Sequence, residues 1–267
     1  MKKTIPLVIA LLGALTAGAS TEPGWRTELA AAEFDALRVE WENGPVTIEP
    51  GHGARLVLEL TPFADGLTLI PNEWLDLCRI EPRAGLLLLA FERGGESERL
   101  GMRLRVELPR SVDIEVKCGN GDVTVITEAG DLDIELGNGD ILVENVNGGI
   151  DATLGNGDLE LGLPEGYAAE ALVTQGNGDS TVRLAPGYAG RLDVELGNGD
   201  IVIELAEVPA NLGLEAESSL GEVRTNLGGG EARAELLSES FELSGDGPRI
   251  QAVLGRGDIE INRVDGD

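Results

Sequence analysis

Apolar and polar residues alternate in short runs along most of the chain. In "DLDIELGNGDILVE", residues 131–144, apolar side chains stand at every second position on both sides of a glycine-rich centre. Alternation with a period of two is typical of β-strands that bury one face. The pattern predicts an all-β protein of short strands, with negligible helix after the first nineteen residues.

The glycine-rich centre is a repeated motif. "ELGNGDI" stands at Glu135–Ile141 and again at Glu195–Ile201. Aligned on the first residue of the motif, eight copies begin at Glu42, Gly119, Gly137, Gly155, Gly176, Gly197, Ser219 and Gly255. From Gly119 on, the copies are 18, 18, 21, 21, 22 and 36 residues apart. Such periods indicate a repeat architecture, and the last gap predicts one further, degenerate coil within "LLSESFELSGDG", residues 236–247.

All eight copies carry Gly two residues after their first position, and six have Asn before it. A position that takes only Gly needs positive φ or has no room for a Cβ atom, and Asn also tolerates the left-handed region. The motif is therefore predicted to form a turn, and to recur because the same corner recurs in every repeat. The Asn side chains either only favour the turn or bond one another in an amide ladder, and we favour the ladder. These turn and ladder positions are Asn120, Gly121, Asn138, Gly139, Asn156, Gly157, Asn177, Gly178, Asn198 and Gly199.

Asn-Gly between alternating runs is also a strong hairpin signal, so a meander of hairpins has to be considered. A meander would need a second layer to cover its apolar face, and the sequence offers no helices for one. The extra residues of the longer repeats also fall at one place, "PEGY" at Pro164–Tyr167 and "APGY" at Ala185–Tyr188. Insertions confined to one corner are typical of stacked coils, which favours a solenoid.

Three stretches share a Leu-Pro, Ala-Pro or Val-Pro lead, an alternating strand, a Gly corner and a second strand: "LPRSVDIEVKCGNGDVTV", "APGYAGRLDVELGNGDIVI" and "VPANLGLEAESSLGEVRT". This pattern resembles the DUF4097 family, the toast-rack domains of exported bacterial proteins that carry an adhesin label. The resemblance covers residues 36–264 and implies a single-stranded β-helical stack with an adhesin-like role. The sequence departs from the pattern in residues 50–110, where Trp74, Cys78 and an arginine-rich stretch replace the motif.

The expected layout is a single-stranded β-solenoid of about eleven short coils of 18–22 residues each. Residues 36–264 form the repeat domain, residues 20–35 a linker and N-terminal cap, and residues 265–267 a polar tail. Residues 1–19 form a signal peptide, because Lys2 and Lys3 precede a short apolar run that ends in a small-residue cleavage site at Ala17–Ala19. No later stretch has the length of a membrane span. We therefore expect a periplasmic, extracellular or cell-surface protein.

The net charge of the chain limits the classes of binding partner. Without Lys2 and Lys3 the chain has 18 basic and 48 acidic side chains, a net charge of −30. Residues 111–204 alone hold 19 acidic and 3 basic groups. This argues against nucleic acid and anionic membranes as partners, and leaves an unidentified envelope or surface component.

The motif aspartates form the one candidate metal site. Asp122, Asp140, Asp158, Asp179 and Asp200 occupy the same corner in successive repeats. Their stacked carboxylates would repel one another unless solvent, backbone N–H groups or a cation offset the charge. Calcium takes carboxylate oxygens, but each corner supplies only one carboxylate. Turn-capping aspartates are therefore expected, with weak calcium binding as the alternative.

No catalytic group is expected, and no cofactor. His52 is the only histidine and lies in a Gly-flanked turn, so no multi-His metal site can form, and the single candidate for a His-based triad is expected to be an exposed loop residue. Cys78 and Cys118 either form one disulfide or remain free thiols, and the sequence does not decide between these.

The predicted function is a non-enzymatic exported β-repeat protein, an adhesin or an envelope interaction module. A calcium-stabilised structural module is the first alternative. An enzyme that acts on polysaccharides is the second, although aromatic residues make up only 3% of the chain and the charge is acidic.

Overall fold

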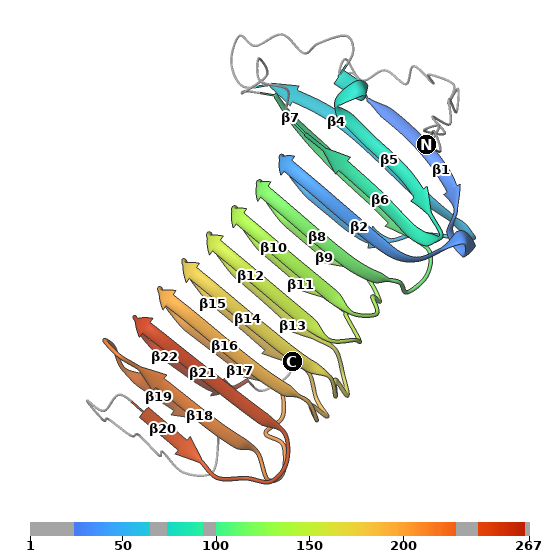
Figure 1. Cartoon of the computed structure of the whole chain (residues 1–267). Coiled ribbons are helices and arrows are strands. Elements are labelled where there is room, and N and C mark those ends of the chain that lie inside the picture. Colours follow the sequence, from blue (N-terminus) through green and yellow to red (C-terminus); the bar gives the residue numbers. More distant parts are fainter. Residues whose placement is uncertain (1–23, 65–73, 93–99, 228–239, 265–267) are drawn as a thin grey trace, which may run out of the picture.

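The computed structural model describes residues 24–64, 74–92, 100–227 and 240–264. Twenty-two strands form two sheets of eleven strands each, which lie face to face along the length of the molecule (Figure 1). Sheet A has the order β1-β4-β7-β3-β9-β11-β13-β15-β17-β22-β19. Sheet B has the order β20-β18-β21-β16-β14-β12-β10-β8-β2-β6-β5. The predicted all-β solenoid is confirmed, and the two 3₁₀ turns are the only helical elements among the described residues.

Each regular coil is one strand in sheet B, the glycine corner, and one strand in sheet A. Because the two strands of a coil lie in different sheets and each pairs in parallel with the next coil, the hairpin interpretation is wrong. The five regular coils are β8 (Asp113–Asn120) with β9 (Val123–Ile126), β10 (Leu132–Asn138) with β11 (Ile141–Glu144), β12 (Ile150–Asn156) with β13 (Leu159–Leu163), β14 (Glu170–Asn177) with β15 (Ser180–Leu184), and β16 (Arg191–Asn198) with β17 (Ile201–Leu205).

The core consists of columns of aliphatic side chains between the two sheets. In sheet B the register aligns Ile134 with Val116 and Ala152, and in sheet A it aligns Ile141 with Val123 and Leu159. Ile134 is completely buried. Burying one such side chain contributes about 1.5–3 kcal/mol. The stack therefore obtains its core from many thin layers and needs few aromatic residues.

The N-terminal end of the stack departs from the repeat. It comprises β1 (Trp25–Ala30), η1 (Ala31–Glu33), β2 (Phe34–Asn43), β3 (Val46–Pro50), β4 (Arg55–Ala64), η2 (Trp74–Leu77), β5 (Cys78–Arg83), β6 (Gly85–Phe91) and β7 (Leu100–Leu108). β4 runs antiparallel to both β1 and β7, and β5 runs antiparallel to β6. β1 is the outermost strand of sheet A, so part of the segment expected to be a linker and cap belongs to the sheet.

Coils at both ends of the chain lie inside the stack. The first coil, β2–β3, sits between β6–β7 and β8–β9. The C-terminal strands are β18 (Gly213–Ser218), β19 (Val223–Asn226), β20 (Ser240–Leu243), β21 (Arg249–Arg256) and β22 (Ile259–Arg263). The last coil, β21–β22, lies between β16–β17 and β18–β19. The chain thus passes over one layer and returns to fill it.

The prediction of an extra coil within residues 236–247 is wrong. Of that stretch, residues 240–243 form β20, which pairs antiparallel with β18 at the edge of sheet B. The expected signal peptide, residues 1–19, and the expected polar tail, residues 265–267, lie outside the described residues.

Candidate functional site

The repeated corner depends on glycine for two reasons. Gly139 has φ of +132°, and a Cβ atom on it would lie 2.5 Å from the carbonyl oxygen of Gly121 in the preceding coil. Seven of the eight corner glycines have positive φ, and Gly221 does not. The corner therefore needs both the left-handed backbone and the missing side chain, because successive corners lie in direct contact.

The corner asparagines form an amide ladder. Nδ2 of Asn138 donates to Oδ1 of Asn120 at 3.1 Å, and Asn156, Asn177 and Asn198 each donate to the preceding Asn at 2.9, 2.8 and 3.0 Å. The ladder ends where Arg256 of β21 lies beside Asn198. Each side chain is held by its neighbours, so the ladder keeps the corners in register.

The corner aspartates cap the backbone of the next coil. The N–H of Asp140 donates to Oδ1 of Asp122 at 3.1 Å, and Asp158, Asp179 and Asp200 repeat this contact at 2.9 Å each. The column continues through Asp258 at 2.8 Å and ends at the N–H of Glu222 at 3.0 Å. These N–H groups offset part of the repulsion between stacked carboxylates.

The five candidate calcium ligands thus lie side by side. One carboxylate oxygen of each already accepts a backbone hydrogen bond. Within the described ranges, no group of three or more His, Cys, Asp or Glu side chains has an arrangement that could hold a metal ion.

Calcium is expected to raise the melting temperature no more than magnesium does, and moderate sodium chloride should match both, because screening alone relieves the repulsion in the column. Thermal melts in each salt, with chelator as the reference, measure this. A calcium-selective rise that disappears when Asp140 and Asp158 are both changed to Asn would contradict it. In that case stabilisation should follow mass action, about 2.7 kcal/mol at one hundred times the dissociation constant.

Of the two alternatives for Cys78 and Cys118, a disulfide or free thiols, the structure has free thiols. Cys78 lies in β5 and Cys118 in β8, with β6 and β2 between them in sheet B. Three strand spacings put the two residues about 14 Å apart, which is too far for a disulfide. Burial raises the pKa of Cys118 to about 11 and that of Cys78 to about 12, so neither is an activated thiolate.

One coil buries a polar pair, and the hydrogen bonds of the pair give it a structural role. Gln175 and Ser180 interrupt the apolar columns of one coil, and the Ser180 hydroxyl donates to Oε1 of Gln175. Nε2 of Gln175 donates to the carbonyl oxygen of Gly157 at 2.6 Å, so the buried pair is satisfied. His52 is exposed in the turn after β3.

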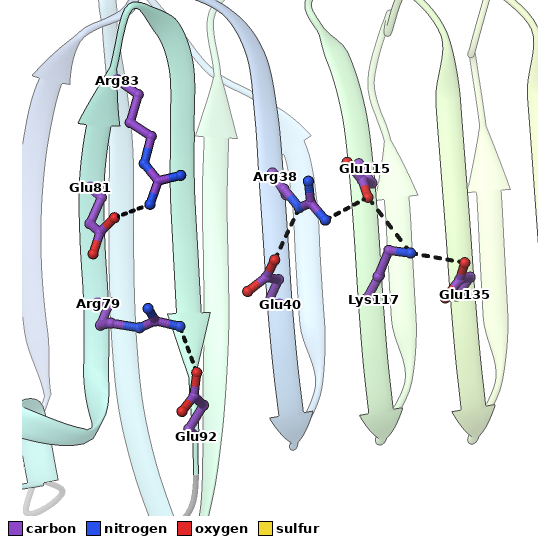
Figure 2. Close-up of polar contacts among 9 residues, drawn as sticks. All are labelled: Arg38, Glu40, Arg79, Glu81, Arg83, Glu92, Glu115, Lys117 and Glu135. Carbon is purple, nitrogen blue, oxygen red and sulfur yellow. Dashed lines mark hydrogen bonds and ion pairs between the residues drawn. The ribbon is translucent and has the colours of Figure 1, made fainter.

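The outer face of sheet B carries a chain of ion pairs that stops abruptly. Figure 2 shows Arg38 of β2 between Glu40 and Glu115, at 3.1 and 3.2 Å, and Lys117 of β8 bound to Glu135 at 2.9 Å. The hydrogen bond that Lys117 donates to the Glu135 carboxylate raises the pKa of Lys117. Beyond β10 this network ends, and the next ion pairs in sheet B are those of Arg191 of β16 with Glu170 and Asp193.

A groove of about 460 Å³ opens on this face, across β2, β8, β10, β12 and β14. Its charged lining residues are acidic apart from Arg38, and the acidic ones are Asp113, Asp131, Glu115, Asp133, Asp151 and Glu170. Its floor is partly apolar, with Ala36, Leu86 and Leu172. We call this feature the acidic groove.

Two carboxylates of the acidic groove lie outside its ion pairs. Asp133 and Asp151 are neighbours in register, both exposed, and neither forms an ion pair with any residue that the structure describes. By contrast, Glu170 is 3.5 Å from Nη1 of Arg191, and Oδ1 of Asp131 accepts the N–H of Gly149 at 2.9 Å. Lys117 attracts Asp133 without forming an ion pair with it, and the centre of the groove remains negative because its carboxylates outnumber its cations.

The acidic groove is not apparent from the sequence alone. The charge count over residues 111–204 signals an acidic surface, but the outward positions become a single face only when the register is known. The site depends on small outward residues, Ala36 and Gly149, next to acidic ones.

Three solved structures illustrate the similarity to known proteins. They are a "putative cell adhesion protein" from Clostridium sporogenes, a "putative adhesin" from Bacteroides fragilis and a "putative lipid binding protein" from Parabacteroides distasonis. The identities are 12, 12 and 14%, and the TM-scores 0.39, 0.39 and 0.36. The matches cover 91, 91 and 90% of this chain and 100, 97 and 96% of the respective structures. At these scores the likeness carries no argument about function.

No curated protein matches the chain. Nor do the described residues contain a helix with the length and apolar character of a membrane span.

The family model of DUF4097, described as Toastrack, matches residues 101–267. These residues contain seven of the eight corner motifs, the amide ladder and the aspartate column. The chain therefore belongs to the DUF4097 Toastrack family.

Proposed function

We propose that the protein is a non-enzymatic, exported interaction module that binds a cationic component of the cell envelope or cell surface through the acidic groove. The observation that carries this proposal is the pair Asp133 and Asp151, both exposed and neither in an ion pair with a described residue, in a groove whose lining is partly apolar. The amide ladder and the aspartate column fix the strands that carry these two residues.

The chemistry of the groove favours a lysine-rich protein segment as partner. A lysine side chain has an apolar stem and a charged end, so it can lie on an apolar surface while its ammonium group contacts an acidic rim. Leu172 lies beside Asp151 in the register and offers such a surface, and Asp133 and Asp151 offer the acceptors. The N-terminal signal-peptide pattern supports export to a compartment where envelope proteins are encountered.

A double variant tests the proposal. Asp133→Asn with Asp151→Asn should weaken binding of the purified protein to a lysine-rich peptide, and to an isolated envelope fraction, by about tenfold or more, because two charge-assisted contacts are lost. The matched control is Glu128→Gln with Glu144→Gln, which removes the same charge from residues outside the groove. Equal loss in both double variants, or in neither, would contradict the groove as the binding site.

A further inference from the structure

The two sheets are staggered at both ends of the stack. Beyond the first coil, β2–β3, sheet A continues with β7, β4 and β1, whereas sheet B continues with only β6 and β5. At the other end, beyond coil β18–β19, sheet B continues with β20 and sheet A stops at β19. Sheet A therefore overhangs at the N-terminal end, and sheet B overhangs at the C-terminal end (Figure 1).

Each overhang leaves half of a core layer without its facing strand. The core-facing side chains of β1 are Trp25, Thr27 and Leu29, and no described strand of sheet B lies opposite β1. In β20 they are Phe241 and Leu243, and no described strand of sheet A lies opposite β20. Trp25, Leu29 and Phe241 are only half-buried, and Leu243 is 40% exposed.

The two half-layers fit each other. Because both sheets have eleven strands, one displacement of a second copy along the stack continues both sheets at once. β1 of the second copy then follows β19, β5 follows β20, and β1 covers the apolar face of β20. We propose that copies of this chain associate head to tail through these half-layers.

The strand directions suit this pairing. β1 and β7 are both antiparallel to β4, so β1 runs in the direction of the regular coils, as β19 does. β5 and β20 are both reversed relative to their coils. Both new seams are thus parallel, and they join strand edges that pair with no other described strand; such edges are ready templates for another chain.

The outward charges agree with the same arrangement. β5 presents Arg79 and Arg83, which pair with Glu92 and Glu81 in the same copy (Figure 2). β20 presents Glu242, next to Glu215 of β18. Head-to-tail association places the arginine-rich edge beside the acidic one. A head-to-tail contact between identical copies is open-ended, so it produces chains of copies rather than closed dimers.

Two variants, each disabling one end, test this inference. Leu243→Glu disables the β20 end and Leu29→Glu the β1 end. Sedimentation or light scattering of the processed protein should show a mass that rises at least twofold with concentration, whereas each variant alone stays at monomer mass. An equimolar mixture of the two should form one-to-one dimers and nothing larger, because only one productive contact remains. Val264→Glu, an equally exposed apolar position on neither overhang, should associate like the original protein.

A protein that stays monomeric at every concentration overturns the inference, as does a mixture of the variants that forms no dimer. Association that survives Leu29→Glu also overturns it, since it indicates a contact between two C-terminal ends. Circular dichroism melts confirm that each variant is folded. If Leu29→Glu does not fold, Arg79→Glu with Arg83→Glu replaces it, because both side chains are exposed and surface ion pairs contribute little to folding.

Discussion

Gly139→Val is expected to destabilise the protein by about 4 kcal/mol or more, among the largest effects of a single substitution. Valine strongly disfavours the φ of +132° at this corner, and its Cβ would lie 2.5 Å from the carbonyl oxygen of Gly121. The contact atom belongs to backbone in the middle of the stack, where coils on both sides prevent it from moving. Thermal or denaturant unfolding measures the loss.

Two matched variants separate the corner from general effects. Gly162→Val makes the same substitution in β13, where the backbone is extended and the nearest atom to a Cβ is Cγ of Glu144 at 3.5 Å, so it should change stability by about 0.5 kcal/mol or less. Asp140→Asn keeps an oxygen that can accept the N–H of Asp158 and relieves repulsion, so it should also be mild. Equal losses in all three variants would refute the turn interpretation of Gly139.

Deletion of residues 249–267 is expected to abolish the hydrogen-exchange protection of β18 and β19, although both strands remain in the chain. β22 is the only described partner of β19, and without β21 the strand β18 keeps only β20. A two-stranded ribbon is marginally stable in water. Amide exchange in β18 and β19 should therefore accelerate by about a hundredfold or more.

A second truncation supplies the control for the deletion. A chain that ends at Ala206 keeps coil β16–β17 as a simple outer coil, so β10 to β15 should be as protected in it as in the longer truncation. Retained protection of β18 and β19 in the longer truncation would contradict the prediction. It would mean that these strands move to the edge of β16–β17 and that the order of the coils is not fixed.

The parts of the fold that were predictable are those that the sequence of a single repeat determines. The period of two in β10 and β11 gives buried and exposed faces, and the invariant corner glycines give the turn. Asn at one position of successive repeats predicts the ladder that the hydrogen bonds display. The strand faces and the turns depend on residues close in the sequence, and the ladder depends on identical residues in successive repeats. Both kinds of information are present in a single sequence.

The order of the coils was not predictable from periodicity, because β18 and β21 both offer an alternating strand that can pair with β16. One signal becomes clear with the structure. Asp258 continues the carboxylate column after Asp200, whereas Glu222 only donates its N–H and ends it. The acidic groove was missed for a related reason, since Asp133 and Asp151 become neighbours only through the register.

The buried position of the last coil has a mechanical consequence. A pull on the C-terminus of an ordinary solenoid peels off an outer coil, one hydrogen bond after another along a single edge. Here β21 is bonded to β16 and β18, and β22 to β17 and β19, so the same pull loads two edges in each sheet together. The end of the chain is therefore held in shear between neighbours, and tension on it meets more resistance than tension on an outermost strand.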